Sequence, residues 1–174
     1  MSTPEGIDNI LEAVLLAAGE PVSIERLLEV FADEGIDRAT LRDALARLQE
    51  RYSGRGIELY ESAGGWRIRV RAAMAPWVAR LWPSSPPRYS RAVLETLALI
   101  AWRQPITRSE IEAVRGVSVN AQIVRTLQER GWIHVVGHKE APGRPALYAT
   151  TRRFLDDFGL RRLEDLPSWT LPEA

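Results

Sequence analysis

The chain has 174 residues, of which 45% are hydrophobic and 26% are charged, enough for one ordinary domain or two small ones. The chain has 23 basic residues (Lys and Arg) and 23 acidic residues (Asp and Glu), so its formal net charge is zero. This excludes a positive electrostatic field over the whole protein that would attract it to nucleic acid or to an anionic membrane. Cysteine is absent, which excludes disulfides, thiolate metal sites and cysteine nucleophiles. No apolar run approaches ~18 residues, and no basic segment precedes an apolar stretch at the N-terminus. We therefore expect a soluble, cytoplasmic protein.

A proline cluster divides the chain into two halves. The run Pro-Ser-Ser-Pro-Pro at residues 83–87 cannot continue a helix and favours extended chain. The prediction is an N-terminal domain over residues 1–82, a linker over 83–89, a C-terminal domain over 90–158 and a tail over 159–174. The tail combines leucines with prolines, so it is either a strap packed on the second domain or a partner-binding segment.

The first half begins with three amphipathic helices. Apolar residues spaced i, i+3, i+4 and i+7 predict a helix over residues 7–18, which Gly19 and Pro21 end. Ser23 is expected to cap a second helix, and Asp37 a third whose inward residues run to Tyr52.

After the third helix, the spacing of the apolar residues changes from that of a helix to that of a strand. Residues 57–61 and 66–71 alternate between apolar and polar, with two glycines between them, which predicts a β-hairpin. Pairing across that turn places Leu59 opposite Ile68 on one face and Glu58 opposite Arg69 on the other, so aliphatic burial and charge pairing agree. A short helix is expected around residues 76–82.

The second half repeats this order. Ser90 is expected to cap a first helix, which stops before Gln104-Pro105. Thr107 and Glu110 are expected to form a capping box at the start of a second helix, and a third helix is expected over about 118–130. A hairpin over 132–137 and 146–150 and a last helix over 151–158 complete the pattern. Three helices followed by a hairpin is the order of a winged helix-turn-helix domain. We therefore predict an α+β fold, mostly helical, with two such domains in tandem and two hairpin wings.

No catalytic pattern is present. His134 and His138 share a face if their strand is regular, but a metal site needs further ligands, and no HExxH motif occurs; the alternative is a pair of exposed polar wing residues. No GxSxG elbow and no phosphate-binding GxxxxGK[ST] loop are found. We expect no enzyme activity, no cofactor and no metal.

The first wing is the strongest candidate for nucleic-acid contact. Arg67, Arg69 and Arg71 alternate onto one face, with Arg55 nearby and Glu58 placed to neutralise one of them. These four arginines are either part of a solvated hairpin face or a weak DNA contact.

The helix over residues 93–102 has more apolar surface than one small core needs. Its apolar positions cover about 200°, whereas a core-facing stripe needs roughly 100°. One flank should therefore face either the other domain or a partner chain. We expect Leu99 and Trp102 to lie away from the Leu94/Leu97/Ala101 stripe and to stay partly exposed.

Several blocks of sequence resemble the segregation and condensation protein B family. The most specific are Gln-Pro-Ile-Thr-Arg at 104–108 and Pro-Gly-Arg-Pro at 142–145, and the likeness covers residues ~7–167. Trp102 stands where the family usually has tyrosine, Trp132 where an aliphatic residue is common and His138 where arginine is common. Any hydroxyl hydrogen bond at the first of these positions is therefore in doubt.

The resemblance implies two winged-helix domains used for protein contacts. It implies a homodimer formed largely by the N-terminal domains, which binds the kleisin subunit (segregation and condensation protein A) and, through it, the SMC ATPase. This nucleoid-associated complex condenses and partitions the bacterial chromosome. The alternative from another class is a tandem winged-helix transcription regulator.

We expect the kleisin to dock on the second domain, on a patch around the end of the 93–102 helix and the hairpin tip. The patch comprises Leu99, Trp102, Arg103, Gln104, Pro105, Arg108 and Arg144. The alternative for Trp102 is packing against residues 76–82 or the tail within its own chain.

Overall fold

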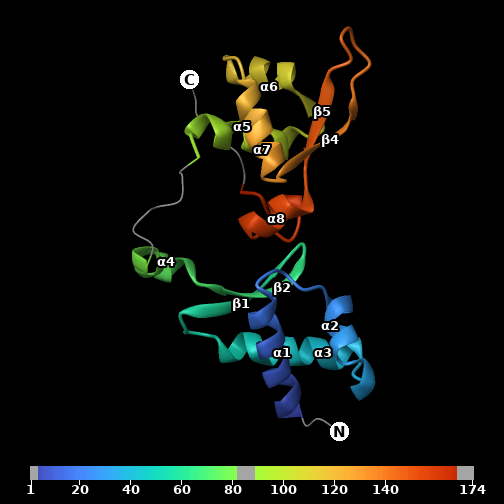
Figure 1. Ribbon diagram of the computed structural model, residues 1–174, viewed down its shortest axis with the longest axis vertical. Coiled ribbons are helices and arrows are strands. Elements are labelled where there is room, and N and C mark those ends of the chain that lie inside the picture. The colour runs from blue at the N-terminus through green and yellow to red at the C-terminus, as the bar shows by residue number, and fades with distance from the viewer. Residues whose placement is uncertain (1–3, 82–88, 168–174) are drawn as a thin grey trace. The chain divides into compact units, whose positions relative to one another are not determined.

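The computed structural model describes residues 4–81 and 89–167, which form two compact units (Figure 1). Unit 1 comprises residues 4–81 together with Gly159–Arg162, and unit 2 comprises residues 89–158 together with 163–167. Of the predicted linker, only Tyr89 lies among the described residues, and residues 168–174 of the predicted tail lie outside them.

Unit 1 contains three helices followed by a hairpin, as the sequence predicts. The elements are α1 (Pro4–Ala18), α2 (Ile24–Val30), α3 (Arg38–Arg51), β1 (Ile57–Ser62) and β2 (Gly65–Val70). Both predicted caps are confirmed, because Ser23 accepts a hydrogen bond from the Arg26 N–H and Asp37 accepts one from the Thr40 N–H. A 3-10 turn, η1 (Ala32–Glu34), extends α2 to Gly35, which has a left-handed φ of 65°.

The register of the first hairpin is also confirmed. Leu59 pairs with Ile68 and Glu58 with Arg69, as alternation and charge pairing require. After β2 come three short turns of helix, η2 (Ala72–Met74), α4 (Ala75–Val78) and η3 (Ala79–Leu81), in place of the single short helix expected there.

The core of unit 1 is aliphatic and draws on every main element of the unit. Its buried side chains from α1, α2 and its following turn, α3 and β1 are Ile7, Leu11, Leu15, Leu27, Phe31, Leu41, Ala44, Leu45, Leu48 and Leu59. All of these are inward positions of the helical and strand periodicities, whereas Ile10 and Ala18, which the spacing places on the same stripe of α1, are exposed.

Unit 2 repeats the order with one addition. Its elements are α5 (Arg91–Arg103), β3 (Ile106–Thr107), α6 (Arg108–Arg115), α7 (Ala121–Glu129), β4 (Ile133–His138), β5 (Ala146–Thr150), α8 (Arg152–Phe158) and η4 (Leu163–Asp165). The Ser90 cap and the Thr107/Glu110 capping box are confirmed. Helix α7 begins three residues later than expected, because Asn120 caps it and the preceding Val119 is buried and donates its N–H to Glu112.

The addition is β3, which the sequence analysis missed. It pairs with β5, so the sheet of unit 2 has three strands in the order β3-β5-β4. Two residues are too short a run to show alternation. Both units are therefore winged helices with a short pairing segment between the first and second helices, and in unit 1 that segment is reduced to one bridge between Val22 and Trp66.

A β-bulge in β4 corrects the expectation for the two histidines. Val136 is the extra residue, so that Val135 pairs with Tyr148 and Gly137 with Leu147. His134 then pairs with Ala149 and His138 with Ala146, three residues apart on the partner strand. Because side chains alternate between faces, the bulge places the two histidines on opposite faces of the sheet.

An aromatic cluster closes one end of unit 2. The Trp132 ring lies 5.0 Å from that of Tyr89 and 5.1 Å from that of Phe158, both edge-to-face, and Phe158 also stacks on Phe154. The indole N–H of Trp132 donates to Asp157 at 2.8 Å. Its single polar group is thus satisfied, as burial of a tryptophan requires.

Candidate protein-interaction surfaces

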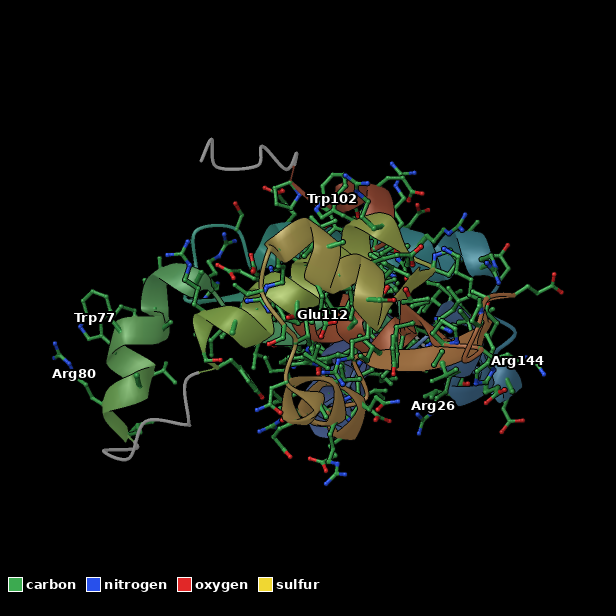
Figure 2. The ribbon with its side chains drawn as sticks, turned by 90° about the horizontal axis from the view of Figure 1, so that it is seen from above. Arg26, Trp77, Arg80, Trp102, Glu112 and Arg144 are labelled. Carbon is green, nitrogen blue, oxygen red and sulfur yellow. The ribbon has the colours of Figure 1, made fainter. Side chains whose placement is uncertain are left out.

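Helix α5 presents an exposed apolar ridge on the side away from its core. Leu94 is 44% exposed and Trp102 is 41% exposed, and the exposed Ala98 lies between them at i+4 spacing. Trp102 stands at the last turn of the helix (Figure 2). The opposite side of α5 is buried, so this helix is apolar on two sides.

The expected position of Leu99 is wrong. Leu99 is only 2% exposed, whereas Leu94, placed in the core by the sequence analysis, is exposed. The buried arc turns further round the helix because it includes Thr96, which was not counted as a core residue. The Thr96 hydroxyl donates to the Ala92 carbonyl at 2.8 Å, and a hydroxyl satisfied within its own helix can be buried. Leu99 therefore belongs to the core and not to a contact surface.

A cavity of about 320 Å³ adjoins the end of the α5 ridge. Arg103 and Pro105, two of the predicted contact residues, line it together with residues of β3 and α6: Ile106, Glu110, Ala113 and Val114. On one wall, Glu110 accepts hydrogen bonds from Lys139 and from the Thr107 N–H and hydroxyl, and these contacts lower the pKa of Glu110 to about 2. The Lys139 ammonium lies 2.5 Å from the Glu110 carboxylate.

Gln104 has an internal structural role. Its side-chain oxygen accepts hydrogen bonds from the Thr150 N–H at 2.6 Å and the Thr150 hydroxyl at 3.0 Å, and its amide N–H donates to the Ala101 carbonyl. These bonds connect the end of α5 to β5. Because they use its polar groups within unit 2, Gln104 does not add to the candidate contact surface.

The remaining two predicted contact residues do not line this cavity. Arg108 pairs with Glu112 along α6 at 3.1 Å. Arg144 projects from the loop between β4 and β5, with a positive φ of 41°, well separated from Trp102 (Figure 2). The structure thus brings together only Trp102, Arg103 and Pro105 of the predicted patch and adds Leu94 and Ala98.

Three of the four candidate arginines of unit 1, Arg55, Arg69 and Arg71, interact with neighbouring groups. Arg69 donates to Glu58 at 2.8 Å and its guanidinium lies 3.5 Å from the centre of the Tyr60 ring. Arg71 lies 3.6 Å from the same carboxylate. Arg55 donates to the backbone carbonyl of Arg51 at 3.1 Å. Because one carboxylate faces two of the four arginines, the surface is less cationic than its sequence, and weak DNA contact through Arg55, Arg67, Arg69 and Arg71 stays a prediction.

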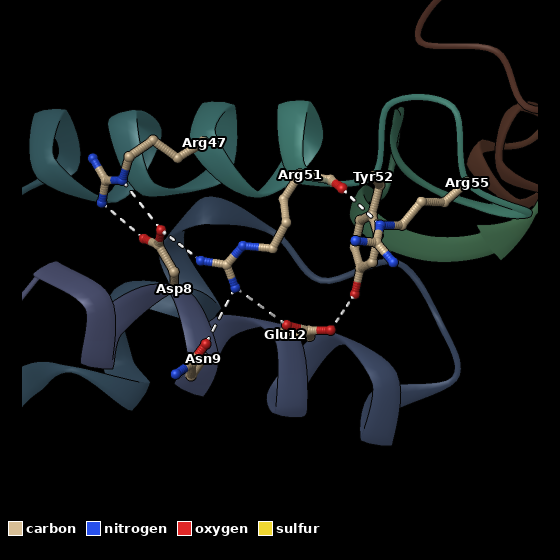
Figure 3. Close-up of polar contacts among 7 residues, drawn as sticks. All are labelled: Asp8, Asn9, Glu12, Arg47, Arg51, Tyr52 and Arg55. Carbon is tan, nitrogen blue, oxygen red and sulfur yellow. Dashed lines mark hydrogen bonds and ion pairs between the residues drawn. The ribbon is translucent and has the colours of Figure 1, made fainter.

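An ionic network centred on the buried Asp8 joins α1 to α3 in unit 1, and the sequence analysis did not find it (Figure 3). Asp8 is 4% exposed and accepts hydrogen bonds from Arg47 at 2.8 and 3.2 Å and from Arg51 at 3.4 Å. Arg51 continues to Asn9 and Glu12. The available signal was the matching i, i+4 spacing of Asp8 and Glu12 on one helix and of Arg47 and Arg51 on the other.

Tyr52 forms the far end of this network. Its hydroxyl donates to Glu12 at 2.7 Å, and burial together with that carboxylate raises the pKa of Tyr52 to about 12. A cavity of about 510 Å³ opens beside it, lined by Glu12, Arg51, Tyr52, Arg55, Gly56 and Ile57. The network links α1 to α3 and to Tyr52, which follows α3.

Over residues 4–81 and 89–167, no three His, Asp or Glu side chains gather closely enough to hold a metal ion. Within the same ranges, no helix combines the length and apolar character needed to cross a membrane.

Comparison with known proteins decides the family. The family model of the segregation and condensation complex subunit ScpB matches residues 9–169. The chain belongs to the ScpB family. It is 49% identical over 159 residues to a segregation and condensation protein B homolog of Coxiella burnetii, covering 91% of this chain and 76% of that protein.

Two further relatives extend this match. Segregation and condensation protein B of Symbiobacterium thermophilum is 50% identical over 160 residues, covering 91% of this chain and 71% of that protein. The crystal structure of ScpB from Mycobacterium tuberculosis is 36% identical, with a TM-score of 0.42, and the match covers 91% of this chain and 98% of that chain. The ScpB match to this chain includes α5, the cavity beside it and most of the Asp8 network.

Proposed function

We propose that this ScpB-family chain is a non-enzymatic subunit of the bacterial SMC–kleisin condensation complex. It binds the kleisin subunit, segregation and condensation protein A, and through it the SMC ATPase, and it acts as a homodimer. The protein works in the cytoplasm on the nucleoid, in chromosome condensation and partition during cell division. Family membership supports the complex, and the exposed α5 ridge is the observation that carries the kleisin site.

The α5 ridge has the composition of a peptide-binding surface. Leu94, Ala98 and Trp102 form one apolar row, and the cavity lined by Arg103 and Pro105 lies at its end. Burying ~100 Å² of apolar surface stabilises a complex by roughly 2.5 kcal/mol, and tryptophan is the residue type most enriched at such anchors. Arg103 at the rim would pair with acidic kleisin residues and raise the association rate more than the affinity.

The test is a binding measurement between the full chain and its kleisin. Trp102→Ala and Leu94→Ala should each weaken binding about 5-fold or more, since truncating an interface anchor costs at least ~1 kcal/mol. Both variants should melt near the wild-type temperature. Val136→Ala on β4, an equally exposed apolar residue in the same unit, is the matched control and should bind normally.

Normal kleisin binding by both ridge variants would place the kleisin site elsewhere. A pull-down of the tagged chain from its native host tests the wider proposal, because recovery of neither kleisin nor SMC ATPase contradicts membership of that complex. Binding to duplex DNA at nanomolar level near physiological salt would instead favour the transcription-regulator alternative.

A further inference from the structure

The α5 ridge has a notch at its centre. Leu94 and Trp102 are large and exposed, and the small, exposed Ala98 lies between them. Because a helix rises 1.5 Å per residue, consecutive members of this row stand about 6 Å apart along the axis. A side chain of another segment can therefore enter between the two large residues and lie against the helix at Ala98.

The chain carries an apolar segment directly after the described part of unit 2. Residues 163–167 belong to unit 2, where Leu163 and Leu166 are half-buried and the Leu166 N–H donates to the Leu163 carbonyl at 3.0 Å. The next seven residues, Ser-Trp-Thr-Leu-Pro-Glu-Ala, are here called the 168–174 segment and lie outside the described residues. This segment is therefore attached to the same unit that carries the ridge.

The sequence of the 168–174 segment alternates in a way that suits the ridge. Pro172 favours extended backbone at the residue before it, and side chains of an extended chain alternate between two sides. Trp169, Leu171 and Glu173 then share one side, at a spacing of about 6.6 Å. Two apolar side chains followed by a carboxylate thus repeat nearly the ~6 Å spacing of the ridge.

Charge favours the same match. Within α5, Arg91 pairs with Glu95 at 2.7 Å, whereas Arg103 is exposed where the ridge ends. Residues 163–174 carry three acidic side chains and no Lys or Arg. Glu173 follows the two apolar side chains on their side of the segment, so a segment that runs along the ridge brings unlike charges together at its end.

We propose that the 168–174 segment docks on the α5 ridge of its own unit and competes there with the kleisin. Trp169 enters the notch at Ala98, and Glu173 reaches Arg103. The inference rests on the kleisin site of the proposed function and adds the regulation of that site, because the kleisin has to displace the segment before it can bind.

The length and the attachment of the segment are sufficient for this contact. Seven extended residues span up to about 23 Å, whereas the ridge from Leu94 to Trp102 is about 12 Å long. A segment on a short tether acts at an effective concentration in the millimolar range, so a weak contact is enough to cover the ridge. A ridge that is free in about one molecule in five raises the dissociation constant of the kleisin about 5-fold.

The binding test measures the affinity of full-chain variants for the kleisin. Trp169→Ala/Leu171→Ala should lower the dissociation constant about 5-fold, because the ridge is then free in every molecule. Thr170→Ala, on the other side of the same segment, is the matched control and should bind like the wild type.

Cross-linking tests the placement of the segment in the absence of the kleisin. The protein contains no cysteine, so introduced thiols react without background. In an Ala98→Cys/Ser168→Cys chain, a short bismaleimide should join the two thiols within one molecule, and excess kleisin should suppress this product. Val136→Cys/Ser168→Cys, with its first thiol on β4 at an equally exposed position, is the control and should give far less internal product.

The outcomes separate this docking from the proposed function. Unchanged kleisin affinity of Trp169→Ala/Leu171→Ala, with no preference of the Ser168→Cys thiol for the ridge, overturns the docking and leaves the kleisin site standing. An internal product that the kleisin does not suppress, together with normal kleisin binding by the ridge variants, overturns the competition and the kleisin site alike.

Two further results would also contradict the proposal. Weaker kleisin binding by Trp169→Ala/Leu171→Ala would make the segment part of the kleisin site. A covalent dimer as the main product of the Ala98→Cys/Ser168→Cys chain would place the segment on the ridge of a second copy.

Discussion

The two units share one topology but differ in how far the segment before the second helix pairs with the wing. Val22 in unit 1 makes a single bridge to Trp66, while Ile106 in unit 2 begins a two-residue strand opposite Tyr148. The next position of the wing strand is Gly65 in unit 1 and Leu147 in unit 2. The fold therefore tolerates a pairing of one residue with the wing in unit 1, where Gly65 allows the backbone of Val22 to lie close to the wing strand.

The units also differ in what holds their helices together. Unit 1 ties α1 to α3 through the buried carboxylate of Asp8, whereas unit 2 packs Trp132 against the rings of Tyr89 and Phe158. Buried aliphatic side chains make up most of the core in both units. The polar and aromatic groups around the core are specific to each unit.

Gly65→Ala should give the largest effect. A Cβ at this position would lie 2.1 Å from the Val22 carbonyl oxygen, and the φ of 126° is one that residues with a side chain rarely adopt. We expect unit 1 to lose more than about 3 kcal/mol, as for other strained backbone sites. Chemical unfolding followed by hydrogen exchange of peptides from each unit measures this. Leu147→Ala is the control in unit 2, and equal losses in the two units would contradict the glycine explanation.

Leu99→Ala should destabilise unit 2 by about 3 kcal/mol, the usual cost of a cavity left by a buried leucine. Leu94→Ala, on the exposed side of the same helix, should change the unfolding free energy by less than about 0.5 kcal/mol. Urea unfolding of the two variants gives this difference directly. Similar losses would mean that both sides of α5 are buried in the isolated protein.

Asp8→Asn should destabilise unit 1 by about 2 kcal/mol. The substitution removes the negative charge between two guanidinium groups, and the cost is below that of a fully buried pair because both arginines are nearly half exposed. Unit 2 should be unaffected in the same hydrogen-exchange experiment. Asp43→Asn, an exposed carboxylate on α3, serves as the control, and an equal effect of the two variants would argue against the network.

Tyr52 gives unit 1 a response to alkaline pH. Its pKa is raised to about 12 in the folded protein, so the unfolded chain loses this proton first, near pH 10. Its contribution is complete below pH 10 and is lost between about pH 10 and 12, with a slope of at most about 1.4 kcal/mol per pH unit. Tyr52→Phe should remove this slope in pH-dependent unfolding of unit 1. An unchanged slope would show that another group titrates.

Glu110 gives unit 2 a response in the opposite direction, at acid pH. Its pKa is lowered to about 2, so its contribution is complete above pH 4.5 and is lost as the pH falls toward 2. Glu110→Gln keeps the residue type that a capping box accepts but removes the titration. In this variant, the unfolding free energy of unit 2 should fall less steeply as the pH is lowered below 4.5. The acid dependence of unit 1 should stay as in the wild type. A steeper fall of the unfolding free energy of unit 2 with falling pH in the variant would contradict the assignment to Glu110.

Local sequence signals predicted most of the fold. Caps such as Asp37 and the alternation around Leu59 act over a few residues, so their effects can be read without knowing the tertiary structure. The bulge at Val136 and the strand at Ile106 depend on a partner that is more than ten residues away. No local pattern records that pairing.

The candidate site was predicted less well, because it depends on which side of α5 is buried. The sequence analysis counted only apolar residues and therefore expected the side of α5 that carries Leu94 to face the core. The hydroxyl of Thr96, satisfied by its own helix, turned the buried arc toward Leu99. The Asp8 network was missed for a related reason, since a charged residue beside an apolar stripe looks like solvent-facing surface until its partners on α3 are known.

The bulge in β4 bears on how the protein behaves when it is crowded. Strand β4 is an edge of its sheet and carries the exposed Val135 and Val136, so a straight ladder there would offer unpaired backbone groups beside apolar side chains. Such an edge is a template for sheet growth between molecules and for aggregation. The extra residue breaks the regular spacing of those groups. The wing can therefore still make specific contacts, while the bulge hinders pairing of β4 with the same strand of another molecule.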